Sequence, residues 1–244
     1  MIKKALILLS LLIPTVANAY ECTKQIKSLA REYEINISCD PRSYAYNSSI
    51  HGEQSEYYLL NNFSPYLKSF LDSYPKDFVK KNIKNLYLAT NLLMNSYPVA
   101  GLSDGKNIWV KTMIYNGTNK QFYFIVLHHE FSSNILKNDY ADQRQWKIFS
   151  IANYDESLSF FKENLTNYEF SRSVNHQLLE EGFINNYAKT NPENDFNTYA
   201  ETLFTNPEKM KTLSLKFKII DRKLSFLKDV YRKNGFTGKF PDEP

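Results

Sequence analysis

The residues best suited to chemistry lie together at positions 127–133, which read Leu-His-His-Glu-Phe-Ser-Ser. In an H-E-x-x-H helix, two histidines one turn apart bind zinc, and the intervening glutamate is the general base toward a metal-bound water. His129 and Glu130 fill the first two places of this pattern, but Ser133 stands where the second histidine belongs. His128 cannot substitute, because adjacent helical side chains point about 100° apart. A His-Glu pair is also typical of satisfied polar residues in a core, so both interpretations stay open.

The pair lies in an apolar segment, residues 118–137, which we expect to form a buried central helix that begins after Asn116-Gly117. Turn residues at 101–105 and a strand pattern at 108–112 precede this helix. The sequence therefore predicts that a short strand leads through a loop into the helix that carries the candidate chemistry.

The remaining periodicities predict more helix than strand. Apolar residues at three- and four-residue steps indicate helices, and a strand is expected near residues 86–88. We expect an α+β, mostly helical fold with a small sheet, a signal peptide over residues 1–19, an N-terminal helical section over 20–75 and a second section over 76–244. The helices are expected at 22–34, 53–74, 178–188, 195–204 and, as one long helix, 208–233.

Two segments of the second half carry a resemblance to a known family. Residues 180–188 read Glu-Glu-Gly-Phe-Ile-Asn-Asn-Tyr-Ala, and residues 194–204 read Asn-Asp-Phe-Asn-Thr-Tyr-Ala-Glu-Thr-Leu-Phe. Together with His129-Glu130, they resemble bacterial zinc metallopeptidases of the gluzincin type, which include lethal-factor-like zincins. Those enzymes follow the H-E-x-x-H helix with a Gly-Phe-x-x-x-Tyr-Ala segment and then a helix that supplies the third zinc ligand. The resemblance covers roughly residues 80–215 and implies a zincin-like fold for the section over 76–244.

The resemblance implies a zinc cofactor and a role for each matching residue. His129 becomes a zinc ligand, Glu201 the preferred third ligand and Asp195 its alternate, while Glu130 becomes the general base. Tyr187 matches a tyrosine that helps to stabilise the tetrahedral intermediate in some relatives. His176 is a further candidate to complete the metal shell, although no motif places it.

Three functions follow from these residues. The first is an exported zinc metallopeptidase that hydrolyses a peptide or protein substrate with a metal-activated water. The second is a non-catalytic relative that binds a peptide or protein partner. The third is a helical envelope protein of unrelated role, in which case the similarity is accidental.

The start of the chain predicts export. Met-Ile-Lys-Lys is followed by an apolar stretch over residues 5–13, and Val-Ala-Asn-Ala at 16–19 matches a cleavage site after Ala19. The apolar stretch is about half as long as a membrane span, so we expect no transmembrane segment after cleavage and a periplasmic or secreted protein. Cleavage lowers the formal charge from +4 to +2, because Lys3 and Lys4 leave. This near-neutral balance excludes a polybasic nucleic-acid binder.

Two cysteines, Cys22 and Cys39, remain in the exported chain. An oxidising compartment favours their pairing, which would close a loop of about 17 residues and contribute about 3 kcal/mol to stability. A thiol active site or a two-cysteine zinc site is the alternative, but neither cysteine has a histidine nearby in the sequence.

Overall fold

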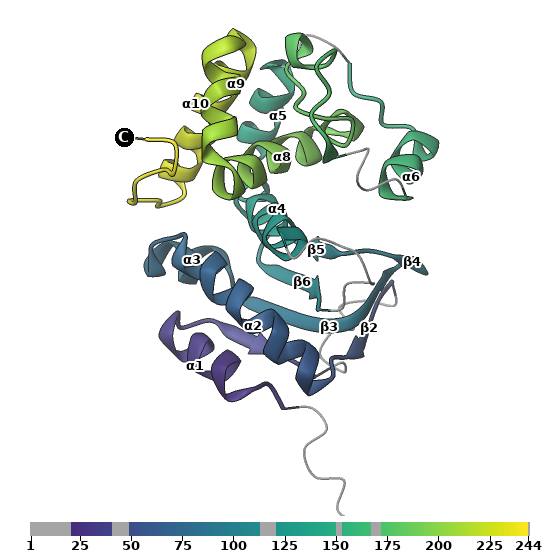
Figure 1. Ribbon diagram of the computed structural model, residues 1–244, viewed down its shortest axis with the longest axis vertical. Coiled ribbons are helices and arrows are strands. Elements are labelled where there is room, and N and C mark those ends of the chain that lie inside the picture. Colours follow the sequence, from purple (N-terminus) through teal and green to yellow (C-terminus); the bar gives the residue numbers. More distant parts are fainter. Residues whose placement is uncertain (1–20, 41–48, 113–120, 150–152, 167–171, 244) are drawn as a thin grey trace, which may run out of the picture.

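The structure is a computed structural model that describes residues 21–40, 49–112, 121–149, 153–166 and 172–243 (Figure 1). The expected signal peptide and Asn116-Gly117 lie outside these ranges. The described chain is an α+β fold in which helices predominate over one small mixed sheet, which confirms the expected fold class.

In the described residues, six strands form one sheet around the long central strand β3 (Asn85–Met94). The sheet has the order β1-β3-β6-β5; β1 and β6 run parallel to β3, β2 and β4 pair with it in the antiparallel sense, and β5 is antiparallel to β6. The shorter strands are β1 (Asn36–Ser38), β2 (Ile50–Gln54), β4 (Tyr97–Pro98), β5 (Gly101–Ser103) and β6 (Asn107–Lys111).

Side-chain alternation along the strands gives the sheet two different faces. Leu86 and Leu88 of β3 belong to the main core together with helical residues, whereas Ala89 packs with Trp109 on the opposite face. There, the Tyr87 ring stacks on Trp109 at 5.2 Å between ring centroids. Because successive strand residues point to opposite faces, this register directs Leu86 and Leu88 toward the helices.

The helices lie on both sides of α4 (Gln121–Lys137), which crosses the centre of the molecule (Figure 1). The sheet lies on one side of α4 with α1 (Lys24–Glu32), α2 (Tyr57–Asp72) and α3 (Lys76–Asn82). On the other side lie α5 (Tyr140–Phe149), α6 (Leu158–Thr166), α8 (Pro192–Thr205), α9 (Pro207–Lys216), α10 (Lys218–Lys233) and the 3-10 turns η2 (Leu179–Glu181) and η3 (Ala188–Thr190). None of the helices in the described ranges is both long and apolar enough to cross a membrane.

Several expected elements differ from the structure. The helix expected at 178–188 is wrong, because this segment forms only η2 and η3, and η2 ends at Gly182 with φ +89°. The single helix expected at 208–233 is also wrong, because the extended backbone of Phe217 separates α9 from α10. The section expected to be helical over 20–75 also supplies β1 and β2, and one continuous core contains residues from both expected sections.

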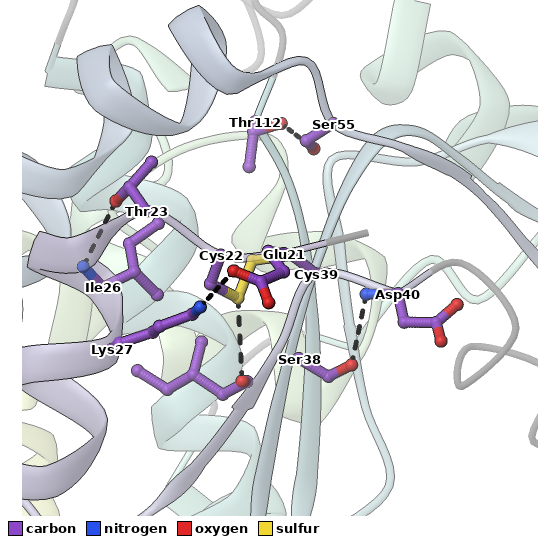
Figure 2. The surroundings of a disulfide bond; sticks show 11 residues. Glu21, Cys22, Thr23, Ile26, Lys27, Ser38, Cys39, Asp40, Ser55 and Thr112 are labelled. Atoms are coloured by element: carbon purple, nitrogen blue, oxygen red, sulfur yellow. Dashed lines mark hydrogen bonds and ion pairs between the residues drawn. A yellow bond between two sulfur atoms is a disulfide. The ribbon is translucent and has the colours of Figure 1, made fainter. Parts of the chain in front are cut away.

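The expected disulfide between Cys22 and Cys39 is present in the structure (Figure 2). Cys22 lies just before α1 and Cys39 just after β1, with their Cα atoms 5.3 Å apart. Figure 2 also shows the Lys27–Glu21 ion pair beside the bridge. The disulfide thus ties the start of the first helix to the end of the first strand.

Candidate functional site

Helix α4 directs three consecutive polar side chains toward three different surroundings, because successive helical residues point about 100° apart. His129 contacts Glu201 of α8, Glu130 lies against Gly101 of β5, and His128 lies among aromatic rings. All three side chains are buried or nearly so. Helix geometry therefore places His128 in different surroundings from His129 and Glu130, the two residues of the candidate motif.

Glu201 accepts hydrogen bonds from two side chains. His129 Nδ1 donates to Glu201 Oε2 over 3.0 Å, so the structure brings these two candidate ligands together. Arg172 Nη1 lies 2.7 Å from Glu201 Oε1 and 2.8 Å from Oε2. Burial acts to raise the pKa of Glu201, but the charge of Arg172 and the His129 hydrogen bond outweigh it and hold that pKa below its usual value. The carboxylate is therefore ionised and already neutralised by a guanidinium group.

The ring of Tyr187 covers the same guanidinium group. Arg172 Cζ lies 3.7 Å from the centroid of the Tyr187 ring, a cation–π geometry that is favourable when the cation is partly desolvated. The His129 ring lies 5.7 Å and the Phe161 ring 6.4 Å from the Tyr187 ring, between centroids. Burial raises the pKa of the Tyr187 hydroxyl to about 12. The expected tyrosine thus lies in the site and holds Arg172 in place.

Glu130 lies between α4 and the edge of the sheet. A Cβ atom at Gly101 would come within 2.6 Å of Glu130 Cγ, so a side chain at that position would displace the carboxylate. Glu130 is 9% exposed and has no hydrogen-bond or ion-pair partner among the described residues. Burial raises its pKa to about 7, while the charges of His129 and Lys137 act in the opposite direction.

The hydroxyl of Ser133, at the second histidine position of the motif, is committed to α8. It donates to Glu193 Oε1 over 2.7 Å and accepts from Asn197 Nδ2 over 2.6 Å. Lys137 pairs with Glu193 at 2.7 Å and donates to the carbonyl oxygen of Ser103 in β5. Ser133 is therefore part of a packed polar contact between α4 and α8.

The two other candidate ligands lie elsewhere. Asp195 is fully buried against Lys223 and accepts hydrogen bonds from Trp146 and Tyr154. Burial raises the pKa of Asp195, and pairing with Lys223 acts against that rise. His176 is exposed in the segment between α6 and η2. Neither residue joins His129 and Glu201.

His128 is a core residue in this structure. The ring is fully buried, its Nδ1 lies 2.6 Å from the Tyr74 hydroxyl, and it stacks on Phe204 with 5.1 Å between centroids. Its Nε2 has no hydrogen-bond partner in the part of the chain that the structure describes, and burial lowers the pKa of His128 to about 3. His128 is therefore neutral at physiological pH.

These residues do not fit a catalytic zinc ion. Catalytic zinc needs three protein ligands and an open position. Across the described ranges, no three His, Cys, Asp or Glu side chains are grouped so that they could hold a metal. His129 and Glu201 bond directly to each other, and the permanent positive charge of Arg172 lies on the carboxylate that zinc would need.

Arg172 is the site residue that sequence patterns did not predict. It precedes η2 in a polar segment, and no spacing rule connects it with Glu201, which lies 29 residues later. An isolated arginine in such a segment has the same pattern as a solvated surface residue. Only the tertiary structure brings its guanidinium group to Glu201 and Tyr187.

Comparisons with known proteins found one distant structural similarity. No protein-family model and no curated protein matches the chain. The chain is similar to a crystal structure from Bacteroides caccae, of a protein proposed to be a zinc-binding metallo-peptidase, with 16% sequence identity and a TM-score of 0.47. The similarity covers 89% of this chain and 94% of that one. At this distance, the similarity assigns no activity to the present chain.

Proposed function

We propose that this chain is an exported, metallopeptidase-like protein whose site binds a peptide or protein partner without hydrolysing it. The observation that carries the proposal is the ion pair between Arg172 and Glu201 at 2.7 Å, in which the carboxylate is buried and the guanidinium side chain is 16% exposed. A guanidinium group stays charged at any physiological pH. Zinc on Glu201 would therefore place a divalent cation beside a fixed positive charge.

The neighbours of this ion pair also support a binding role. The Ser133 hydroxyl donates one hydrogen bond to α8 and accepts another from it, so Ser133 offers no third metal ligand. Tyr187 lies against the guanidinium group, where it stabilises Arg172 on Glu201. His129, Ser133, Tyr187 and Glu201 thus serve to hold α4, α8 and the Arg172 segment together.

A zinc-dependent peptidase is the second candidate, and the environment of Glu130 favours it. A buried carboxyl group with a pKa of about 7 has the proton affinity that suits a general base near neutral pH. In that alternative, His129 and Glu201 would hold zinc, which would supply an activated water, and Arg172 would have to leave Glu201. The two candidates therefore differ in what Arg172 does.

Metal analysis distinguishes them. We expect mature protein, purified without chelator, to carry far less than one zinc per chain and to leave a mixed peptide substrate uncleaved. One tightly bound zinc per wild-type chain, with peptide cleavage that Glu130→Gln abolishes, would instead establish the peptidase.

Variants then test why zinc is excluded. Ser133→His alone should bind zinc weakly, because Arg172 still holds Glu201. Adding Arg172→Met should raise zinc affinity at least tenfold over Ser133→His alone, about 1.4 kcal/mol, measured by competition with a chromophoric chelator. Arg144→Met, the same change at an exposed position of α5, is the matched control and should change nothing. Equal zinc affinity with and without Arg172 would contradict the proposed role of the guanidinium group.

A further inference from the structure

Three carboxylates meet near the junction of α4 and α8, and two of them have a cation of their own. Glu201 pairs with Arg172 at 2.7 Å, and Glu193 pairs with Lys137 at 2.7 Å. Glu130 is the third, and among the described residues it has no ion-pair partner. Glu130 is therefore the one of these three carboxylates that has no cation paired with it.

The position of Glu130 makes this imbalance costly to the folded protein. Glu130 is only 9% exposed, and its Cγ and Oε1 lie against Gly101. A buried carboxylate without a partner destabilises a fold, and such departures from good packing concentrate at functional sites. Neither carboxylate oxygen of Glu130 is among the fully buried, unpaired polar atoms of the described residues, so the carboxylate stays accessible to a group from outside the chain.

We propose that Glu130 receives the ammonium or guanidinium group of a basic side chain of the bound peptide. This inference rests on the proposed function as a peptide- or protein-binding site. An organic cation fits because one carboxylate is uncommitted, whereas a divalent metal needs several ligands. An anionic ligand fits poorly, because Arg172 and Lys137 are already engaged by carboxylates of the protein.

Gly101 has a specific part in this arrangement. Its missing side chain allows Glu130 to lie against β5, on the side of α4 opposite the aromatic surroundings of His128. Gly101 therefore fixes where the Glu130 carboxylate lies, and the ligand cation would meet the part of that carboxylate that stays exposed. Hydrogen bonds from the ligand to an ionised carboxylate are about twice as strong as neutral ones, which gives selectivity for basic residues.

Peptide mixtures with a fixed central residue test the inference on the mature wild-type protein. Fluorescein-labelled pentapeptides would have arginine, lysine, citrulline or norleucine at the centre and mixed residues elsewhere, and binding would be followed by fluorescence anisotropy. We expect the arginine and lysine mixtures to bind at least tenfold more tightly than the citrulline and norleucine mixtures. Glu130→Gln should reduce this preference to less than about threefold, while Glu180→Gln, the same change at an exposed position of η2, should retain it.

Glu130→Met is the second variant, in case the glutamine variant does not fold. It removes the unpaired charge at similar side-chain length, so it should fold at least as well as the wild type and also lose the preference. If the wild type binds the mixtures with no preference for basic residues, or if the preference survives both variants, the assignment of Glu130 fails and the proposed function stands. If no mixture binds the wild type, both proposals fail.

Discussion

At the scale of single residues, the site is organised by which charges have partners. Glu201 is an anion because Arg172 lies on it, and its bond to His129 follows from that charge. Ser133 and Tyr187 contribute contacts that hold the two helices and the arginine. Removing one member of the ion pair should thus affect the fold as well as the site.

Arg172→Met should lower the free energy of unfolding by about 3 kcal/mol, because it leaves the buried carboxylate of Glu201 without its cation. Glu201→Gln in the same chain should restore part of that loss, since the amide carries no charge to neutralise. Urea unfolding of the two single variants and the double variant, at constant pH, would measure the coupling. Purely additive losses would show that the ion pair contributes nothing specific.

His128 gives the structure a defined response to acid. Its pKa is lowered by burial to about 3, against about 6.5 in the unfolded chain, so the unfolded state binds the proton more tightly. The stability contributed by the neutral ring is therefore present above pH 6.5 and lost as the pH falls toward 3. Between pH 7 and pH 5, this group alone should remove about 2 kcal/mol from the free energy of unfolding.

The variant His128→Gln tests this response, because glutamine cannot take up a proton there. Its free energy of unfolding, from urea titrations at pH 7 and pH 5, should fall less than that of the wild type by about 2 kcal/mol. His51→Gln, at an exposed position of β2, is the control. An equal pH dependence in wild type and His128→Gln would mean that His128 can be protonated in the folded protein.

At the scale of elements, the sequence predicted the helices whose apolar pattern lies within one continuous segment. The apolar run over 118–137 became α4, and the pattern near 195–204 became α8. The break at Phe217 has neither glycine nor proline to mark it, so amphipathic spacing continued across two helices. β1 and β2 were missed because they are three and five residues long and form by pairing with a distant strand.

The candidate site, like the fold, was predictable in part: the sequence indicated several of its residues but not Arg172. The motif and the resemblance pointed to His129, Glu130, Tyr187 and Glu201. The structure places His129 beside both Glu201 and Tyr187, and Arg172 contacts the last two. Arg172 escaped prediction because its role depends on a loop that folds back to α8. Asp195, on the same helix as Glu201, faces α10 instead, where Lys223 binds it.

The pair Asp195–Lys223 should be a principal link among α5, α8 and α10. Both side chains are fully buried, Lys223 donates to the carbonyl oxygen of Gly182, and its Nζ lies 4.9 Å from the centroid of the Trp146 ring. Lys223→Met should cost about 3 to 5 kcal/mol, because it leaves a buried acid without its cation. Adding Asp195→Asn should recover part of that cost in urea unfolding, whereas Lys218→Met at the start of α10 should cost little. A loss below 1 kcal/mol for Lys223→Met would contradict this role.

At the scale of the whole molecule, α4 joins two groups of elements. The sheet and α1–α3 lie on one side, α5–α10 lie on the other, and side chains from both belong to one continuous core (Figure 1). The candidate site lies where α4 meets α8 and β5, so its geometry depends on both groups. The disulfide lies in the first group, outside the candidate site, and should act on stability.

The paired change Cys22→Ser and Cys39→Ser tests that separation of roles. Removing the cross-link frees a loop of 17 residues in the unfolded chain, which should lower the free energy of unfolding by about 3 kcal/mol. Mass spectrometry of the non-reduced wild type should show two hydrogens fewer than the reduced chain. Peptide binding measured below the unfolding transition should be unchanged, since the bridge joins α1 to β1 and contacts none of the site residues. Two free, alkylatable thiols in freshly exported wild-type protein, or a binding loss as large as that of Glu130→Gln, would show that the bridge is absent or that it shapes the site directly.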